Sequence, residues 1–272
     1  MSENNLIKVE LNNDLISGSI SDTSLTDKEL NWGNAKPPTQ KELLWIKSFG
    51  RYPHFNPEPG KLSQRVSIKV ADLKQATRII IYFHYLHRGR TMAQLPYWVL
   101  VDDIAVGVIL YSLPRLSVPI FGIPPMNVVE LARMWLSPDV QGKIIKDSNG
   151  RSHASSIASC VVAQSLKRIQ RDWYTKYPKL PDVLAVVSWA DNVHHEGVIY
   201  KACNFMEKGK SGGSTHGNRA RPNGGRDQLN LDYIHTKTAF LYPYSRRLSD
   251  SIKQKMNALP HTPASQLHLF EE

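Results

Sequence analysis

The stretch YWVLVDDIAVGVILYS, residues 97–112, decides the fold class. Apolar residues fill both of its halves, and the pair Asp102-Asp103 separates them. This pattern is typical of two antiparallel strands joined by a tight turn. The preceding residues, 66–89, start like a strand and continue as a helix. The apolar positions of that helix recur at helical spacing and are Leu73, Ala76, Ile80, Phe83 and Leu86.

The chain after the hairpin alternates strands and helices. Residues 128–136 form an apolar run of strand length, and residues 183–190 have the composition of a buried strand. Residues 155–177 predict one long helix, and residues 194–205 predict a short one. Residues 229–248 predict one or two further strands. The order predicts an α/β fold with mixed strand directions. The buried stripe expected on the long helix is Ile157, Val161, Leu166 and Ile169.

Three regions follow from composition. Residues 1–60 predict a partly disordered arm with a short amphipathic helix at 42–49, and the first 35 or so residues are expected to lie outside the core. Residues 61–250 predict one catalytic domain, which includes a basic, glycine-rich loop at 207–228. Residues 251–272 are expected to form a C-terminal tail.

Charge and cysteine content narrow the function. The 272 residues carry a formal net charge of +10, which favours a polyanionic partner such as nucleic acid but also fits a merely basic protein. Two cysteines give neither a disulfide framework nor a CxxC-type zinc site. No apolar run is long enough to span a membrane, so we expect a cytoplasmic protein without a membrane partner. The oligomeric state stays open, a homodimer included.

The order of elements resembles the GNAT acyltransferase fold, which has a mixed, mostly antiparallel central sheet flanked by helices. That resemblance implies acetyl-CoA or a related acyl donor as the cofactor, with its pyrophosphate at the start of the helix near Ser155 and Ser156. Asn204 stands where the family's Tyr-x-x-x-Gly-Phe ending has glycine. The sequence departs from the family at residues 148–156, SNGRSHASS, which replace the usual glycine-rich pyrophosphate loop.

A narrower resemblance is to the phage Mom family of DNA-modification proteins. It rests on FHYLHRGRTM (83–92), VVELARMWLSPD (128–139), SWADNVHHEGVIYKACNF (188–205) and the basic HTKTAFLYPYSRRL (235–248). The resemblance implies a GNAT-like transferase that adds a carbamoyl-type or acyl-type group to the exocyclic N6 amine of adenine in double-stranded DNA, with an anti-restriction role. The alternatives are an ordinary acetyl-CoA-dependent N-acetyltransferase and a non-catalytic DNA-binding or phage-defence protein.

The candidate catalytic residues lie in two separate phrases. The resemblance implies His84, Tyr85, Asp191 and Tyr200 as active-site residues and as ligands of iron, which mixed imidazole, phenolate and carboxylate groups suit. Tyr200 could protonate a leaving thiolate, and His195, with His194 as its substitute, could act as a base. Structural alternatives remain for each: Asp191 could cap the following helix, and the histidines and tyrosines could simply pack.

Charged residues elsewhere suggest ligand contacts. Glu130 and Arg133 interrupt an apolar strand, which is costly unless they form a salt bridge or face a cofactor cleft. Arg133 is therefore a candidate cofactor-binding residue, and the resemblance to the GNAT fold implies Ser155, Ser156 and Asn204 as further ones. An adenine must leave the duplex stack to react. The candidate nucleic-acid contacts are Arg88, Arg90, Lys208, Lys210, Arg219, Arg221 and Arg226.

Overall fold

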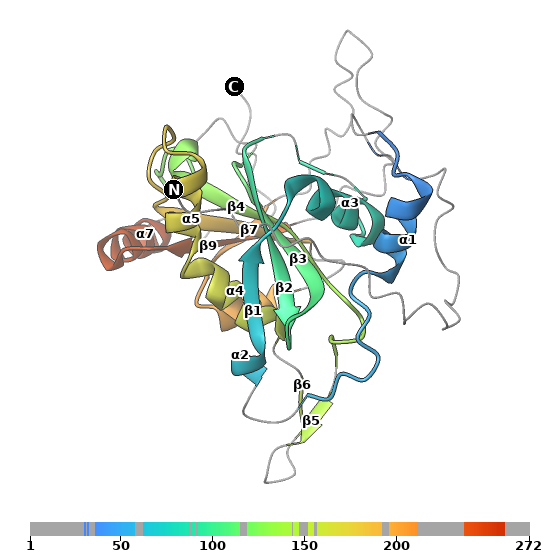
Figure 1. Ribbon diagram of the computed structural model, residues 1–272. Coiled ribbons are helices and arrows are strands. Elements are labelled where there is room, and N and C mark those ends of the chain that lie inside the picture. The colour runs from blue at the N-terminus through green and yellow to red at the C-terminus, as the bar shows by residue number, and fades with distance from the viewer. Residues whose placement is uncertain are drawn as a thin grey trace. The chain divides into compact units, whose positions relative to one another are not determined.

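The computed structural model divides the chain into two compact units (Figure 1). The first unit comprises Met1–Leu116 and Val129–Asp182, and the second comprises Ser117–Val128 and Val183–Glu272. Both contain parts of the region expected to form the catalytic domain. The structure describes residues 30, 32, 36–57, 62–87, 89–90, 92–114, 119–142, 144–146, 152–154, 157–191, 196–211 and 237–258.

The first unit is built on an antiparallel sheet. Its strands follow one another in the order β1 (Val66–Val70), β2 (Gln94–Val101), β3 (Ile104–Ser112) and β4 (Val128–Leu136). The predicted hairpin is confirmed: Asp102 and Asp103 both take positive φ, 50° and 63°, which suits a tight turn between twisted strands. Aspartate tolerates this left-handed conformation better than most residues.

Helices cover both faces of this sheet. Trp98 and Val108, a cross-strand pair, lie in one core with helices α1 (Gln40–Ser48) and α3 (Leu73–Phe83). On the other face the Tyr111 hydroxyl lies 2.6 Å from the hydroxyl of Ser165 in helix α4 (Ile157–Leu166). The Tyr97 hydroxyl donates to Asp172 in helix α5 (Ile169–Lys176) at 3.1 Å. A four-residue helix, α2 (Leu62–Arg65), precedes β1.

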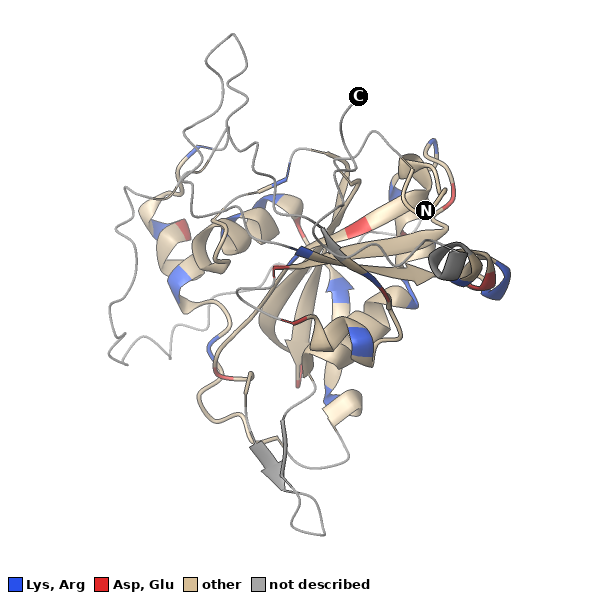
Figure 2. Ribbon diagram, turned by 180° about the vertical axis from the view of Figure 1, so that it is seen from behind, with Lys and Arg blue, Asp and Glu red and all other residues tan. Residues whose placement is uncertain are grey.

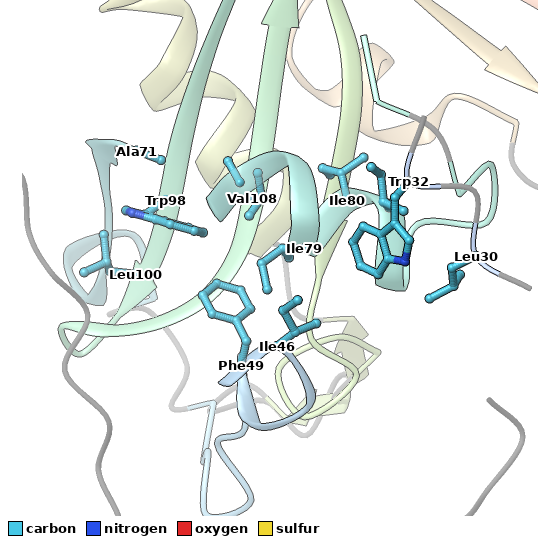
Figure 3. Packing of buried hydrophobic residues seen from close by; sticks show 12 residues of the cluster. Leu30, Trp32, Ile46, Phe49, Ala71, Ile79, Ile80, Trp98, Leu100 and Val108 are labelled. Atoms are coloured by element: carbon cyan, nitrogen blue, oxygen red, sulfur yellow. The ribbon is translucent and has the colours of Figure 1, made fainter. Parts of the chain in front are cut away.

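The apolar core of the α3 face includes a segment expected to lie outside it (Figure 3). Leu30 and Trp32 are 7% and 8% exposed and belong to the same cluster as Ile46, Ile79 and Ile80. The expectation that the first 35 or so residues contribute nothing to the core is therefore wrong. Leu30 and Trp32 form no periodic pattern, but burial of their apolar surface is enough to bring these two side chains into the core.

The predicted long helix over 155–177 is two helices. Its four predicted stripe residues are all buried, as expected. After Leu166 the Arg168 backbone N–H donates to the carbonyl of Ser165, three residues back, at 3.0 Å. The Arg168 guanidinium donates to the carbonyl of Ile68 in β1 at 2.7 Å. This tight turn and its side-chain anchor redirect the chain between α4 and α5.

The second unit has an antiparallel sheet in the order β7 (Ala185–Asp191), β9 (Lys237–Pro243) and β8 (Met206–Ser211). The strand predicted at 183–190 is confirmed as β7. The loop predicted over 207–228 begins instead as strand β8, whose backbone pairs with β9. Helix α7 (Arg246–Ala258) follows β9, where the sequence predicted no helix.

Shorter elements complete the described chain. Strands β5 (Ile144–Lys146) and β6 (Ser152–Ala154) form an antiparallel pair, and a 3₁₀ turn, η2, spans Pro125–Asn127. In the second unit the five-residue helix α6 (Val198–Ala202) lies between β7 and β8. Within the described ranges, no helix has the length and apolar character needed to cross a membrane.

Candidate active site

His84 and Tyr85 follow helix α3 rather than lying on it. Asp72 caps the start of the helix by accepting a hydrogen bond from the Gln75 backbone N–H at 2.8 Å. The helix ends at Phe83, and His84 is its C-terminal cap with an extended backbone, φ −80° and ψ 134°. The expectation that the pair sits on the helix is wrong because the chain turns at His87, whose φ is 43°.

The two side chains stack on one another. Their ring centroids are 4.5 Å apart with planes inclined by 24°, and His84 is only 7% exposed. The Leu86 backbone N–H donates to Nδ1 of His84 at 3.1 Å. Because Nδ1 accepts, the neutral ring carries its proton on Nε2. His84 is therefore held as a hydrogen-bond donor.

This tautomer does not fit the predicted iron site. A metal needs an imidazole lone pair, but Nδ1 of His84 already accepts a hydrogen bond and Nε2 of the neutral ring is protonated. Across the described ranges, no three or more histidine, cysteine, aspartate or glutamate side chains form a group that could hold a metal. The residues do not support iron as a cofactor.

The segment that carries His84 and Tyr85 runs along strand β4. At one end Phe83 stacks on Trp135, with ring centroids 4.3 Å apart and planes inclined by 15°. At the other end the Arg90 guanidinium forms an ion pair with the carboxylate of Glu130. Trp135 and Glu130 are about 16 Å apart along a strand. The seven residue steps from Phe83 to Arg90 can span this distance without full extension.

A bulge in β4 sets which of its side chains meet this segment. Leu110 and Tyr111 of β3 face Arg133 and Leu131, which leaves Ala132 as the extra residue. Glu130 pairs with Ser112, so Glu130 and Arg133 lie on the face of Leu110 and Ser112, which is the α3 face. Nη1 of Arg133 donates to the carbonyl of Ala132 at 2.5 Å.

A buried polar cluster lies at this end of the sheet. It consists of Arg90, Glu130, Ser112 and Gln94, and we call it the Arg90 cluster. Nε of Arg90 donates to the Ser112 hydroxyl at 3.1 Å, and Nε2 of Gln94 donates to the Arg90 carbonyl at 2.8 Å. The Arg90 and Glu130 side chains are 9% and 12% exposed, so this arginine is held inside the first unit and its charge is already balanced.

Asp191 is the last residue of strand β7 and is 3% exposed. It is not the N-cap of the following helix. Helix α6 begins at Val198, later than predicted, because its N-cap is Gly197 with φ 72°, and no side chain caps it. Asp191 therefore has the strand-end position at which α/β proteins bind ligands.

Tyr200 lies in α6 and packs on aromatic rings. Its ring centroid is 5.1 Å from that of Phe240 and 5.5 Å from that of Phe205, and its exposure is 8%. Phe240 pairs with Ser188, so α6 covers the Ser188 face of the sheet. Alternation along β7 directs Asp191 toward the opposite face. A group that both side chains touch must therefore reach around the end of β7.

The structure thus assembles the predicted residues in two sets. His84, Tyr85, Arg90 and Arg133 belong to the first unit, and Asp191 and Tyr200 belong to the second. The convergence of His84 and Tyr85 with Asp191 and Tyr200 stays a prediction. Asn204 is exposed in a turn after α6, with φ 61°.

Several predicted site residues lie outside the described residues. They are the predicted base His195 with its substitute His194, the cofactor contacts Ser155 and Ser156, and the nucleic-acid contacts Arg88, Arg219, Arg221 and Arg226, together with the side chain of Lys210.

Lys208 is the one predicted loop lysine whose side chain the structure describes. It is in β8, its ammonium lies 4.6 Å from the ring centroid of Phe121, and partial burial lowers its pKa. Figure 2 shows lysine and arginine spread over many elements, including helices α1, α3 and α7.

Sequence reasoning missed Gln94 and Ser112. Both are polar residues at the ends of apolar strands, where a polar residue is expected to mark only the end of the strand. The partner of each comes from a distant or irregular segment, so local patterns give no signal for the Arg90 cluster. Glu130 stood out in the sequence, but its partner is Arg90, 40 positions away.

Antiparallel strands flanked by helices define an α/β protein whose candidate site residues follow helix α3, end strand β7 and lie in helix α6. The Mom protein family model matches residues 65–239, and the chain belongs to this family. The resemblance predicted from the sequence is confirmed. A search of curated proteins finds no significant match.

Solved structures that the chain resembles are acetyltransferases. RimL, a ribosomal L7/L12 alpha-N-protein acetyltransferase in its apo form, is 12% identical, with 67% of this chain and 95% of that chain covered and a TM-score of 0.38. A spermidine N-acetyltransferase SpeG chimera from Vibrio cholerae and hSSAT is 10% identical, with 69% and 98% covered and a TM-score of 0.38. The microcin C7 self immunity acetyltransferase MccE, in complex with acetyl-CoA and AMP, is 13% identical, with 55% and 61% covered and a TM-score of 0.29.

Proposed function

We propose that this protein is a transferase that places an acyl-type or carbamoyl-type group on the N6 amine of adenine in DNA. The observation that carries the proposal is the family match over residues 65–239, which includes His84, Tyr85, Asp191 and Tyr200. The net charge of +10 supports a polyanionic substrate. Modified adenine would protect the DNA that carries it from restriction.

The reaction requires an activated carbonyl, which acyl-CoA or a related thioester supplies when bound. The adenine N6 forms a new bond to the carbonyl carbon, the carbon–sulfur bond breaks, and N6 loses one proton. The buried Asp191 carboxylate is the candidate acceptor of that proton. The Tyr200 hydroxyl is the candidate donor to the leaving thiolate.

His84 has a separate role in this scheme. Leu86 holds Nδ1 as an acceptor, so the Nε2–H is the candidate donor to the carbonyl oxygen on which negative charge develops. Arg133 is the candidate contact for the phosphates of the donor. The target adenine must leave the helix stack, and an aromatic side chain such as Tyr85 can stack on it.

Nucleoside mass spectrometry tests the function. The full chain is expressed in bacteria, and deoxynucleosides from a co-resident plasmid are compared with those from cells without the protein. A mass-shifted deoxyadenosine is expected, and the plasmid should resist restriction enzymes whose sites contain adenine. Unmodified DNA from cells that contain abundant folded protein would refute the proposal.

Matched variants separate the rival functions. Asp191→Asn and Tyr200→Phe should abolish the product, whereas Asp103→Asn and Tyr174→Phe, at exposed positions, should not. An ordinary acetyltransferase would acetylate protein or small amines and leave DNA unchanged. A non-catalytic DNA-binding protein would bind DNA equally well with and without Asp191→Asn and would yield no new nucleoside.

A further inference from the structure

Gln94, the first residue of β2, is fixed from two sides. Its backbone N–H donates to the Tyr177 hydroxyl at 2.8 Å, and its carbonyl accepts from the same hydroxyl at 2.7 Å and from Lys176 at 2.8 Å. Burial lowers the pKa of Lys176. On the opposite face the side-chain amide donates to the Arg90 carbonyl. The side chain therefore has little freedom to turn toward water.

The other end of this amide is an acceptor without a donor. Oε1 of Gln94 is buried, and in the part of the chain that the structure describes nothing donates to it. Gln94 as a whole is 7% exposed. A buried carbonyl that loses its water and gains no hydrogen bond lowers stability, so such groups are rare and call for an explanation. Because its placement is rigid, a ligand can supply the missing donor.

The surroundings specify the kind of donor. Arg90 and Glu130 neutralise one another, and the Ser112 hydroxyl accepts from Arg90 and donates to the Leu113 carbonyl at 3.2 Å. The remaining acceptor in this cluster is neutral, so it favours an uncharged N–H group over an ammonium ion. The two charged side chains keep 9% and 12% of their surface exposed, so the cluster is not sealed.

We propose that Oε1 of Gln94 recognises the exocyclic amine of the target base, an inference that rests on the proposed function. Adenine presents an N6–H donor, whereas guanine and thymine present carbonyl acceptors at the equivalent position. An acceptor that faces another acceptor leaves both without a partner, so Gln94 rejects those bases. Gln94 is thus a specificity-determining residue of the proposed reaction. It lies beside the segment that carries His84 and Tyr85.

The test uses Gln94→Met, which keeps the side-chain length and removes the carbonyl. Binding of deoxyadenosine and of deoxyinosine, which has a carbonyl in place of the amine, is measured on the purified full chain by saturation-transfer NMR at millimolar concentrations. Wild type should bind deoxyadenosine about tenfold more tightly than deoxyinosine, and Gln94→Met should lose this preference. Equal binding of both nucleosides by wild type, or an unchanged preference in the variant, overturns the proposal.

Gln164→Met is the matched control. Gln164 also donates from Nε2 to a backbone carbonyl, that of Val66 at 2.7 Å, but lies outside the Arg90 cluster. The Gln164→Met variant should keep the preference for deoxyadenosine over deoxyinosine. Each substitution removes one hydrogen bond from Nε2 to a backbone carbonyl. Gln94→Met also removes an acceptor that has no donor, so its melting temperature should be no lower than that of Gln164→Met. A clearly lower melting temperature assigns Gln94 Oε1 to the fold and overturns the proposal.

Nucleoside analysis of plasmid DNA separates this inference from the proposed function. If wild type modifies adenine and Gln94→Met does so equally, the base-recognition role falls and the function stands. If wild type prefers deoxyadenosine through Gln94 but modifies no DNA, the function falls and the recognition site stands. Loss of both the preference and the product in Gln94→Met supports the two together.

Discussion

Helix α1 is held to helix α3 by Glu42, and replacing this residue by glutamine tests how much that contact contributes. The carboxylate accepts from the Thr39 backbone N–H at 2.9 Å and forms ion pairs with Arg78 and, at 3.7 Å, Lys74. The hydrogen bond from Thr39 and the Arg78 guanidinium lower the pKa of Glu42 from 4.5 to about 2. Arg78 is only 6% exposed.

The pKa shift sets the expected loss. A fall from 4.5 to about 2 corresponds to about 3 kcal/mol of stabilisation. The Glu42 side chain is 33% exposed, so solvent screening reduces this to about 1–2 kcal/mol. Glutamine also leaves the buried Arg78 charge without its carboxylate, which adds to the cost. We expect Glu42→Gln to lower the free energy of unfolding of the first unit by about 2 kcal/mol at pH 7.

Urea unfolding followed by tryptophan fluorescence measures this loss, because Trp45 and Trp98 lie in the affected core, 6.4 Å apart. The folded-state pKa is depressed, so the stabilisation is complete above about pH 4.5 and is lost as the pH falls toward 2. The gap between wild type and variant should therefore shrink below pH 4.5. Glu207→Gln, which breaks an exposed ion pair with Lys201, should cost under about 0.5 kcal/mol. A Glu42→Gln loss equally small at pH 7, or one that is the same at pH 7 and pH 3, would refute the reasoning.

Two further substitutions test the framework of the site. Gly197→Ala should destabilise the second unit by more than about 2 kcal/mol in thermal unfolding, because the new methyl group would overlap the Phe240 ring at a φ of 72°; Gly142→Ala, with φ 63° and open space, should cost only about 1 kcal/mol. Tyr177→Phe should cost about 1–2 kcal/mol because the hydroxyl satisfies two backbone groups at the open edge of β2, whereas Tyr174→Phe, 59% exposed, should be neutral.

Elements with a strong local pattern could be predicted from the sequence. The hairpin at 97–112 carries both apolar strands and a turn that aspartate favours, so its two strands follow from local residues. Helix α1 was predicted from its amphipathic pattern, and the structure adds a capping box formed by Thr39 and Glu42. The strands β4 and β7 were recognisable because a buried strand has a continuous apolar run.

Elements whose ends depend on distant contacts could not be predicted. The apolar stripe that includes Phe83 and Leu86 predicts a helix through His84, yet the helix ends at Phe83, whose ring stacks on Trp135, 52 positions later. The break between α4 and α5 depends on an anchor to β1, and the burial of Leu30 and Trp32 depends on a core built by later helices. Secondary-structure propensity does not predict such contacts between residues that are distant in the sequence.

The candidate site shows the same division. The resemblance to the Mom family implied His84, Tyr85, Asp191 and Tyr200, whose imidazole, phenol and carboxylate groups can carry proton transfer and ligand binding. The tautomer of His84, however, is fixed by the backbone of Leu86, and the ion pair of Arg90 is fixed by a strand 40 positions away. The sequence indicates which chemical groups are present, and the fold determines the tautomer and the ion pair of each group.

The segment from Phe83 to Arg90 is preorganised by its anchors. Both ends are held on β4, by a ring stack with Trp135 and an ion pair with Glu130. Within it the His87 backbone N–H donates to the His84 carbonyl at 2.7 Å, and its ring contacts the Ile81 carbonyl at 2.9 Å. His87 maintains φ 43°, a strained conformation that persists only where its surroundings over-determine it. A turn fixed in this way holds the His84 ring in place before any substrate arrives, as the proposed role of this residue in stabilising developing charge requires.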